Sequence, residues 1–212
     1  MRSVIWDLGG TLLDTYPVVD RALARAVTGG GEPEPSLLDE VARLTRVSSG
    51  HAISELSDRH GVPEMALREA YAATRETWRD DPPAPMAGAE EVLAAVRAGG
   101  GSNLVATHRD RQSALELLSA AGLEVDDLVS ASDGFPRKPD PAMVAELLRR
   151  HDLDPADVLM VGDRPADVEA AGSAGVLGVL LVTAGVEHGQ PGIRRVGALE
   201  ELLGLIGADR SP

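Results

Sequence analysis

The sequence predicts an α/β fold with a mostly parallel, Rossmann-like sheet as its core and an all-helical insert near its beginning. Residues 3–6 form a short apolar run that stops at Asp7 and turns on two glycines, as a buried strand does at its carboxyl end. From about residue 86, apolar runs of strand length alternate with segments of helical spacing, which is typical of βαβ crossovers and a parallel sheet. The residues between these two parts show helical spacing with no convincing strand.

The predicted elements follow from this spacing and from the residues that interrupt it. In the insert, a run of three glycines stops the first helix at residues 29–31, Ser36 suits the N-cap of the second, and Gly61 ends the third. The insert helices are expected at 17–27, 36–47, 51–60 and 64–79. The later helices are expected at 89–98, 111–121, 142–150, 166–174 and 198–206, and the later strands at 103–107, 128–131, 158–161 and 176–182. The proline-rich stretch 80–85 reads as a linker. We therefore expect a core domain of residues 1–14 and 86–212 and a helical domain of residues 15–85.

Composition excludes several classes of protein. The chain is 43% hydrophobic but only 2% aromatic, so its core must be built mostly from Leu, Val, Ala and Ile. A net charge of −14 argues against a nucleic acid or an anionic membrane as the main partner. Cysteine is absent, which excludes disulfides and thiolate metal sites. The short apolar run after Arg2 is broken at Asp7, so we expect no signal peptide and a cytoplasmic location.

Polar residues stand where the predicted strands end, and parallel strands bring such ends to one crevice. They are Asp7, the triplet Thr107-His108-Arg109, and the run Gly162-Asp163-Arg164-Pro165-Ala166-Asp167. Lys138 precedes the last of these strands and is the only lysine in the chain. Because every other basic side chain except histidine is an arginine, the single lysine suggests a need for a compact ammonium charge.

Taken together, these residues resemble the haloacid dehalogenase-like hydrolase superfamily, and in particular its capped, phosphoglycolate phosphatase-like members. The resemblance covers essentially the whole chain in order. Asp7 with the following Gly-Thr is similar to the first motif, Thr107 to the second, Lys138 to the third, and Asp163 with Asp167 to the fourth. The resemblance implies a hydrolase with a Rossmann-like core, in which residues 15–85 form a helical cap domain.

The resemblance implies a phosphatase that works through an aspartyl-phosphate. Asp7 would be the nucleophile, a covalent route open to carboxylates. Thr107 and His108 would bind the phosphoryl group, and Lys138 would neutralise both Asp7 and the transferring group.

The same resemblance implies a magnesium site. A phosphate monoester carries about two negative charges near neutral pH, which a divalent cation offsets, and oxygen ligands suit Mg²⁺. Asp7, Asp163 and the backbone carbonyl of Gly9 would hold the ion, with Asp167 as an outer or variable ligand. Both later aspartates also stand where a helix begins, so helix capping is the alternative role, most readily for Asp167.

Gly9 departs from the family pattern, in which this position carries a second aspartate that serves as general acid and base. Such a group contributes typically ~10²–10⁴ in rate. Three hypotheses follow: hydrolysis is slow or restricted to good leaving groups, His108 supplies the proton transfer, or the protein binds phosphate compounds without turning them over.

Other relatives and classes fit less well. Phosphonate-cleaving members need a cap lysine, and phosphoglucomutase-type members need the missing aspartate. Dehalogenases of the family dispense with metal, against which Asp163 and Asp167 argue. A signalling receiver domain also combines Asp, Thr and Lys, but it is about half this length, carries an acidic pair before its phosphorylated aspartate and lacks the helical insert.

Within the cap, the turn 46–51 offers polar residues that could face a substrate, with a solvated loop as the alternative. Arg46, Ser49 and His51 are the candidates. The expected partner is a small phosphorylated metabolite, with no nucleic acid and no membrane, and the expected assembly is a monomer or homodimer.

Overall fold

A computed structural model describes residues 3–182 and 192–207. The chain divides into two compact units, one formed by Met1–Leu13 with Pro85–Pro212 and the other by Asp14–Ala84. The first unit holds every described strand. The second consists of α1 (Tyr16–Val27), α2 (Pro35–Val47), α3 (Ser49–His60) and α4 (Glu64–Asp80).

The strands of the described residues form one six-stranded parallel sheet with the order β3-β2-β1-β4-β5-β6. In chain order its elements are β1 (Ser3–Trp6), α5 (Ala89–Ala98), β2 (Asn103–Thr107), α6 (Arg111–Ala120), β3 (Asp127–Ser130), α7 (Ala142–Arg150), β4 (Val158–Gly162), α8 (Pro165–Ser173), β5 (Leu177–Leu181), β6 (Arg194–Val196) and α9 (Leu203–Ile206). Short 3₁₀ turns span Ala131–Asp133, Pro155–Asp157 and Leu199–Leu202. The predicted α/β class with a mostly parallel sheet is confirmed.

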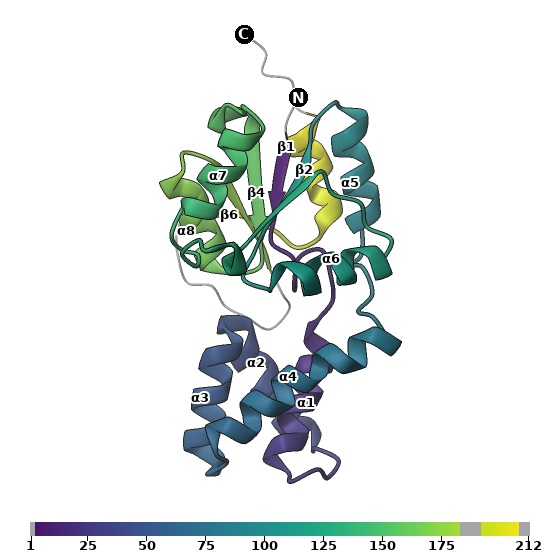
Figure 1. Ribbon diagram of the computed structural model, residues 1–212, viewed down its shortest axis with the longest axis vertical. Helices are drawn as coiled ribbons and strands as arrows, with labels where there is room; N and C mark the ends of the chain where they lie inside the picture. The colour runs from purple at the N-terminus through teal and green to yellow at the C-terminus, as the bar shows by residue number, and fades with distance from the viewer. Residues whose placement is uncertain (1–2, 183–191, 208–212) are drawn as a thin grey trace. The chain divides into compact units, whose positions relative to one another are not determined.

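β1 lies at the centre of the sheet because it pairs with β2 on one side and β4 on the other (Figure 1). All four of its residues are buried. Side chains alternate along the strand, so Ile5 packs in the cluster that α7 and α8 build on one face. On the other face, the Trp6 indole donates to the Asn103 side chain at 3.0 Å, and that amide donates to the Leu93 carbonyl of α5 at 2.9 Å.

The helical unit is held partly by a buried polar cluster. Thr45 Oγ1 donates to Asp20 Oδ1 at 2.6 Å, and Arg46 donates to Asp20 Oδ2 at 2.6 Å. The Arg46 guanidinium also lies 3.8 Å from the centroid of the Tyr16 ring, at cation–π distance. These contacts join α2 to α1. None of the helices in the described ranges has the length and apolarity needed to cross a membrane.

Four elements differ from the sequence-based expectation. α2 begins at Pro35 with Glu34 at its N-cap, so Ser36 lies in the first turn and does not cap the helix. β6 is a three-residue edge strand with two exposed residues, too short to leave a pattern. The helix expected at 198–206 is a 3₁₀ turn followed by the short α9. α3 begins at Ser49, not at 51, because the Ser48 hydroxyl accepts the His51 N–H at 3.0 Å and caps the first turn.

Candidate active site

Three of the predicted site residues meet where neighbouring parallel strands end. Asp7 follows β1, Thr107 ends β2, and Asp163 follows β4. The Asp7 N–H donates to the Val161 carbonyl of β4 at 2.9 Å, which places Asp7 directly at the β1–β4 edge. The sheet is extended from β1 toward β2 on one side and β4 on the other, which makes this edge a topological switch point, the usual ligand site of an open α/β sheet.

Lys138 reaches this edge from the loop before α7. Its Nζ donates to Asp7 Oδ1 at 2.6 Å and to the Ala106 carbonyl at 2.8 Å, and it lies 2.6 Å from Asp167 Oδ1. The Lys138 and Asp167 side chains are each 2% exposed, whereas the Asp7 side chain is 15% exposed. The single lysine is therefore a buried ammonium shared by two carboxylates, one of which is open to a ligand.

Burial and the nearby charges shift the pKa values of Asp7 and Asp167 in opposite directions. Burial, the largest single influence, raises the pKa of Asp7, but the charge and hydrogen bond of Lys138, together with Arg164 and His108, lower it by more, so the pKa of this carboxyl lies below its ordinary value. Burial also raises the pKa of Asp167, and there the attraction of Lys138 does not offset it, since the charge of Asp7 adds to the rise. Burial lowers the pKa of Lys138 while both carboxylates raise it by more, which keeps the amine protonated. Asp7 is thus the ionised, accessible carboxylate that a nucleophile requires.

Asp167 has a second contact that explains its place at the start of α8. Its Oδ2 accepts the Arg164 N–H at 3.1 Å, as a capping carboxylate does. Capping and the ion pair with Lys138 are therefore both present in one side chain. A Cβ at Gly162 would overlap the Asp167 carboxyl group, so glycine at this strand end allows Asp167 to lie against β4.

The acidic residues fit a divalent cation. Asp7, Asp163 and Asp167 each bring a carboxylate oxygen within 4.8 Å of the others, an all-oxygen donor set that suits Mg²⁺. One oxygen of Asp167 already binds Lys138 and the other caps α8. Asp7 and Asp163 are therefore the stronger ligand candidates, and Asp167 fits an outer position. Gly9, the third candidate ligand, lies in the turn two residues after Asp7.

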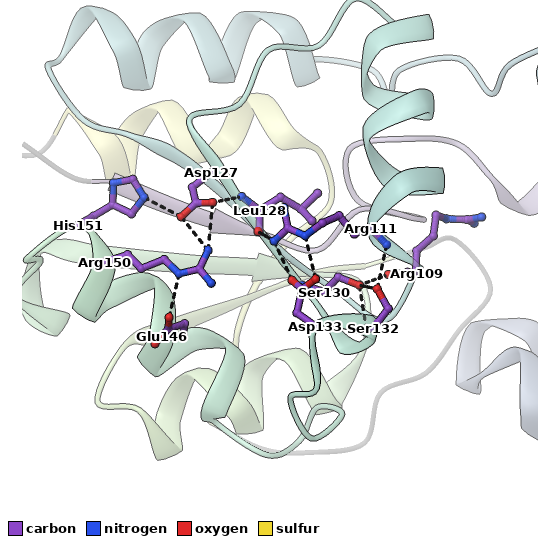
Figure 2. A network of polar contacts seen from close by, with 10 residues as sticks. All are labelled: Arg109, Arg111, Asp127, Leu128, Ser130, Ser132, Asp133, Glu146, Arg150 and His151. Atoms are coloured by element: carbon purple, nitrogen blue, oxygen red, sulfur yellow. Dashed lines mark hydrogen bonds and ion pairs between the residues drawn. The ribbon is translucent and has the colours of Figure 1, made fainter.

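The loop after β2 is fixed by one hydrogen bond within it and one from the end of β3. Thr107 Oγ1 accepts the Arg109 N–H at 3.1 Å, and the Arg109 carbonyl accepts from Ser130 Oγ at 2.6 Å. Figure 2 shows Ser130 and Ser132 beside Arg109, with Ser132 Oγ 2.9 Å from Ser130 Oγ. Ser130 ends β3 in register with Thr107. Sequence reasoning missed Ser130, although its position at a strand end was a signal of the kind that identified Thr107.

His108 is half-buried in the same loop and accepts a hydrogen bond through its ring. Its Nε2 accepts the Lys138 backbone N–H at 2.7 Å. Burial and then the nearby Lys138 charge lower the pKa of His108 to about 4. The imidazole is therefore neutral over the whole range in which most enzymes work.

This pKa predicts how stability depends on pH. The folded state binds a proton at His108 only near pH 4, whereas the unfolded state binds it near 6.5, so the unfolded state holds more protons between these values. The His108 contribution to stability is thus complete above pH 6.5 and is lost as the pH falls toward 4. His108→Gln should flatten that part of the profile, as measured by urea unfolding at pH 7.0, 5.5 and 4.5. Parallel profiles for the two proteins would contradict the shift.

The substrate-facing candidates predicted in the helical insert lie in the unit Asp14–Ala84. Arg46 lies in the last turn of α2, and its guanidinium contacts Asp20 and Tyr16. Ser49 and His51 lie in the first turn of α3. His51 is exposed, and Arg46 is largely buried. The geometry gives Arg46 a structural role within its unit and leaves His51 as the accessible candidate.

The comparison with known proteins places this geometry in a family. A model described as haloacid dehalogenase-like hydrolase matches residues 1–175. The chain belongs to the haloacid dehalogenase-like hydrolases. Among curated members, it is 32% identical over 187 residues to a phosphoglycolate phosphatase of Nitrosospira multiformis, covering 82% of this chain and 80% of the relative. It is 31% identical to one from Vibrio vulnificus, covering 90% and 87%.

Solved structures share this fold. A hydrolase from Streptococcus pneumoniae is 29% identical with a TM-score of 0.65, covering 86% of this chain and 94% of that one. A haloacid dehalogenase family hydrolase from Deinococcus radiodurans, crystallised with bound phosphate and sodium, shares the fold at 21% identity with a TM-score of 0.77 over 98% and 96%. The predicted family is confirmed, and the chain is a phosphatase.

Proposed function

We propose that this haloacid dehalogenase-like protein is a Mg²⁺-dependent phosphohydrolase that acts on a small phosphorylated metabolite through a phosphoryl group carried by Asp7. The observation that supports it most is the pair formed by Asp7 and Lys138 at the switch point of the sheet, 2.6 Å apart, with Asp7 ionised and partly exposed. The curated relatives named phosphoglycolate phosphatase make phosphoglycolate the first substrate to test.

The first step is displacement at phosphorus. An Asp7 carboxylate oxygen forms a bond to phosphorus while the bond from phosphorus to the ester oxygen breaks and its electron pair leaves with that oxygen. The Lys138 ammonium and the donors around Thr107 face the charge on the phosphoryl oxygens. A bound Mg²⁺, held by Asp7 and Asp163, would supply a Lewis acid that offsets the repulsion between substrate and carboxylate.

The second step hydrolyses the aspartyl-phosphate and frees Asp7. The oxygen of a water molecule forms a bond to the phosphorus of the aspartyl-phosphate while the bond from phosphorus to the Asp7 oxygen breaks. The electron pair of that bond regenerates the Asp7 carboxylate, and the water gives up a proton as inorganic phosphate is released. In both steps a proton must move, and Gly9 has no side chain to carry it. We propose that turnover is therefore slow or restricted to substrates with good leaving groups. Acyl and aryl phosphates are such substrates, because their carboxylate or phenolate departs without prior protonation.

Gly9 also supports a second candidate, a protein that binds phosphate compounds and hydrolyses them negligibly. One experiment separates the two. Phosphate release is measured from an aryl phosphate, an acyl phosphate and phosphoglycolate, with Mg²⁺ and after chelation, for the wild type and for Asp7→Asn. We expect release that requires Mg²⁺, is abolished in the variant and is fastest with the aryl and acyl compounds. Tight Mg²⁺-dependent binding without release over hours would favour the binding protein, and a phospho-aspartate that persists would favour a receiver-like role.

We propose that the unit Asp14–Ala84 is the cap that selects the substrate. His51 and Arg46 should then respond differently to substitution. His51→Ala is expected to change KM while leaving the thermal midpoint unchanged, because the side chain is exposed. Arg46→Ala should lower the midpoint, since it leaves Asp20 buried without its cation. Thermal melts and steady-state kinetics of both variants check this, and an unchanged KM for His51→Ala would remove it as a candidate.

A further inference from the structure

His108 joins two segments that the chain places thirty residues apart. Its imidazole belongs to the loop after β2, and its Nε2 accepts the backbone N–H of Lys138 at 2.7 Å. The carbonyl of Ala106, two residues earlier, accepts from the Lys138 ammonium at 2.8 Å. The short stretch 106–108 therefore holds Lys138 at both of its ends, the main chain and the Nζ atom.

Holding Lys138 at both its main chain and its Nζ atom fixes the position of its charge. A lysine carries its charge on a flexible four-carbon stem, so a fixed ammonium needs a fixed main chain as well as a partner at its tip. The Lys138 Nζ lies 2.6 Å from one oxygen of Asp7 and 2.6 Å from one oxygen of Asp167. A small displacement of the backbone would lengthen both contacts. The hydrogen bond that the Lys138 N–H donates to His108 Nε2 holds this backbone in place.

The same hydrogen bond determines what His108 can do chemically. To accept at Nε2, the neutral ring must carry its proton on Nδ1. The Nε2 lone pair is then occupied by an amide that cannot give up its proton. His108 is consequently poorly placed to relay protons through Nε2, which is what replacing the acid and base absent at Gly9 would require.

We propose that His108 is a positioning residue of the phosphoryl-transfer site, holding the Lys138 main chain so that its ammonium stays on Asp7. The proposal rests on the proposed phosphohydrolase function and assigns His108 no proton transfer. It predicts that any side chain with an acceptor at the place of Nε2 can substitute for the imidazole.

Three variants test this. Glutamine can place its amide oxygen near the position of Nε2, asparagine is polar but too short, and leucine fills the space without an acceptor. We expect His108→Gln to stay close to wild type in kcat/KM on an aryl phosphate. We expect His108→Asn and His108→Leu to lose up to about 10²-fold, mainly in kcat, because the charge facing the transition state is misplaced. Thermal midpoints show whether each variant is folded.

The pH profile separates positioning from proton transfer. The charged groups that act on His108 are Lys138, Asp7, Arg137 and Arg164. All of them remain in the glutamine variant. A positioning role therefore predicts the same pH profile of kcat/KM for wild type and His108→Gln. If His108→Gln loses as much activity as His108→Leu and one limb of the profile disappears, His108 transfers a proton and the proposal fails.

A second measurement does not depend on activity. Because Lys138 is the only lysine, labelling with ¹⁵N-lysine gives one backbone amide signal. With ¹⁵N-histidine added, we expect a coupling between this amide nitrogen and one imidazole nitrogen, absent in His108→Gln. Amide exchange should be about 5–10-fold faster in His108→Leu than in wild type or His108→Gln, the loss of roughly one hydrogen bond.

These readouts keep the two proposals apart. If the wild type releases no phosphate, the phosphohydrolase proposal fails, and Mg²⁺-dependent affinity for orthovanadate then reports on the placement of Lys138 in the same variants. Weaker vanadate binding in His108→Leu, with wild-type binding in His108→Gln, supports the positioning role. The positioning role would be overturned if the Lys138 amide of His108→Leu exchanged as slowly as that of the wild type. Full activity and full vanadate binding in His108→Leu would also overturn it.

Discussion

Gly9→Asp is expected to raise kcat on an alkyl phosphate by about 10²–10⁴-fold, equivalent to roughly 3–5 kcal/mol of barrier. The new carboxyl group would protonate the departing alkoxide and then activate water on the phosphorylated Asp7. The main chain permits the change: the turn requires a left-handed residue at Gly10, with φ of 87°, but Gly9 is not among the left-handed glycines of the described residues.

The size of this gain should depend on the leaving group. An aryl phosphate needs little protonation, so its first step should gain far less than that of an alkyl phosphate. Gly9→Asn is the matched control, because it adds nearly the same volume and polarity without a proton to transfer. Steady-state phosphate release from both substrates checks the prediction. A comparable gain in the asparagine variant, or no gain with aspartate, would show that the missing carboxyl group does not limit the rate.

Lys138→Met is expected to cost about 3–5 kcal/mol of unfolding free energy at pH 7.5, as is typical when one partner of a buried ion pair is removed. The ammonium lies 2.6 Å from both Asp7 and Asp167, and methionine would leave two close carboxylates without their cation. The loss should shrink as the pH falls, because protonation neutralises the carboxylates and the folded state of the variant then binds more protons than the unfolded state. Activity should fall with it, since the charge facing the phosphoryl group is gone.

Urea unfolding at pH 7.5 and 5.0, with a chelator present, measures the difference between wild type and Lys138→Met. The double variant with Asp167→Asn is the control, because it removes the carboxylate whose pKa is already raised. It should recover part of the lost stability and none of the activity. A stability gap that is equal at both pH values would mean that the two carboxylates are not what destabilises the variant.

Most of the fold could be predicted from the sequence because the patterns that indicate helices and strands are local. The strand ending at Asp7 is a run of four buried residues, and the crossover helices have stripes that apolar periodicity shows directly. Parallel strands then fix where their ends meet, so Thr107 and Asp163 could be assigned to the edge that holds Asp7. The short β6 and the capped start of α3 were missed, since an edge strand of three residues and a single serine hydroxyl leave no periodic trace.

The α/β class, the resemblance to the family, the strand-end aspartates and the missing carboxyl group at Gly9 are all readable from residue type and order. How these residues share their charges is visible only in the folded protein. The fold places one ammonium between Asp7 and Asp167, gives Asp167 a capping role beside its ion pair, and joins His108 to the Lys138 main chain. The reason is physical: a pKa and a hydrogen bond depend on atoms brought together from distant parts of the chain and on their burial, neither of which spacing along a sequence specifies.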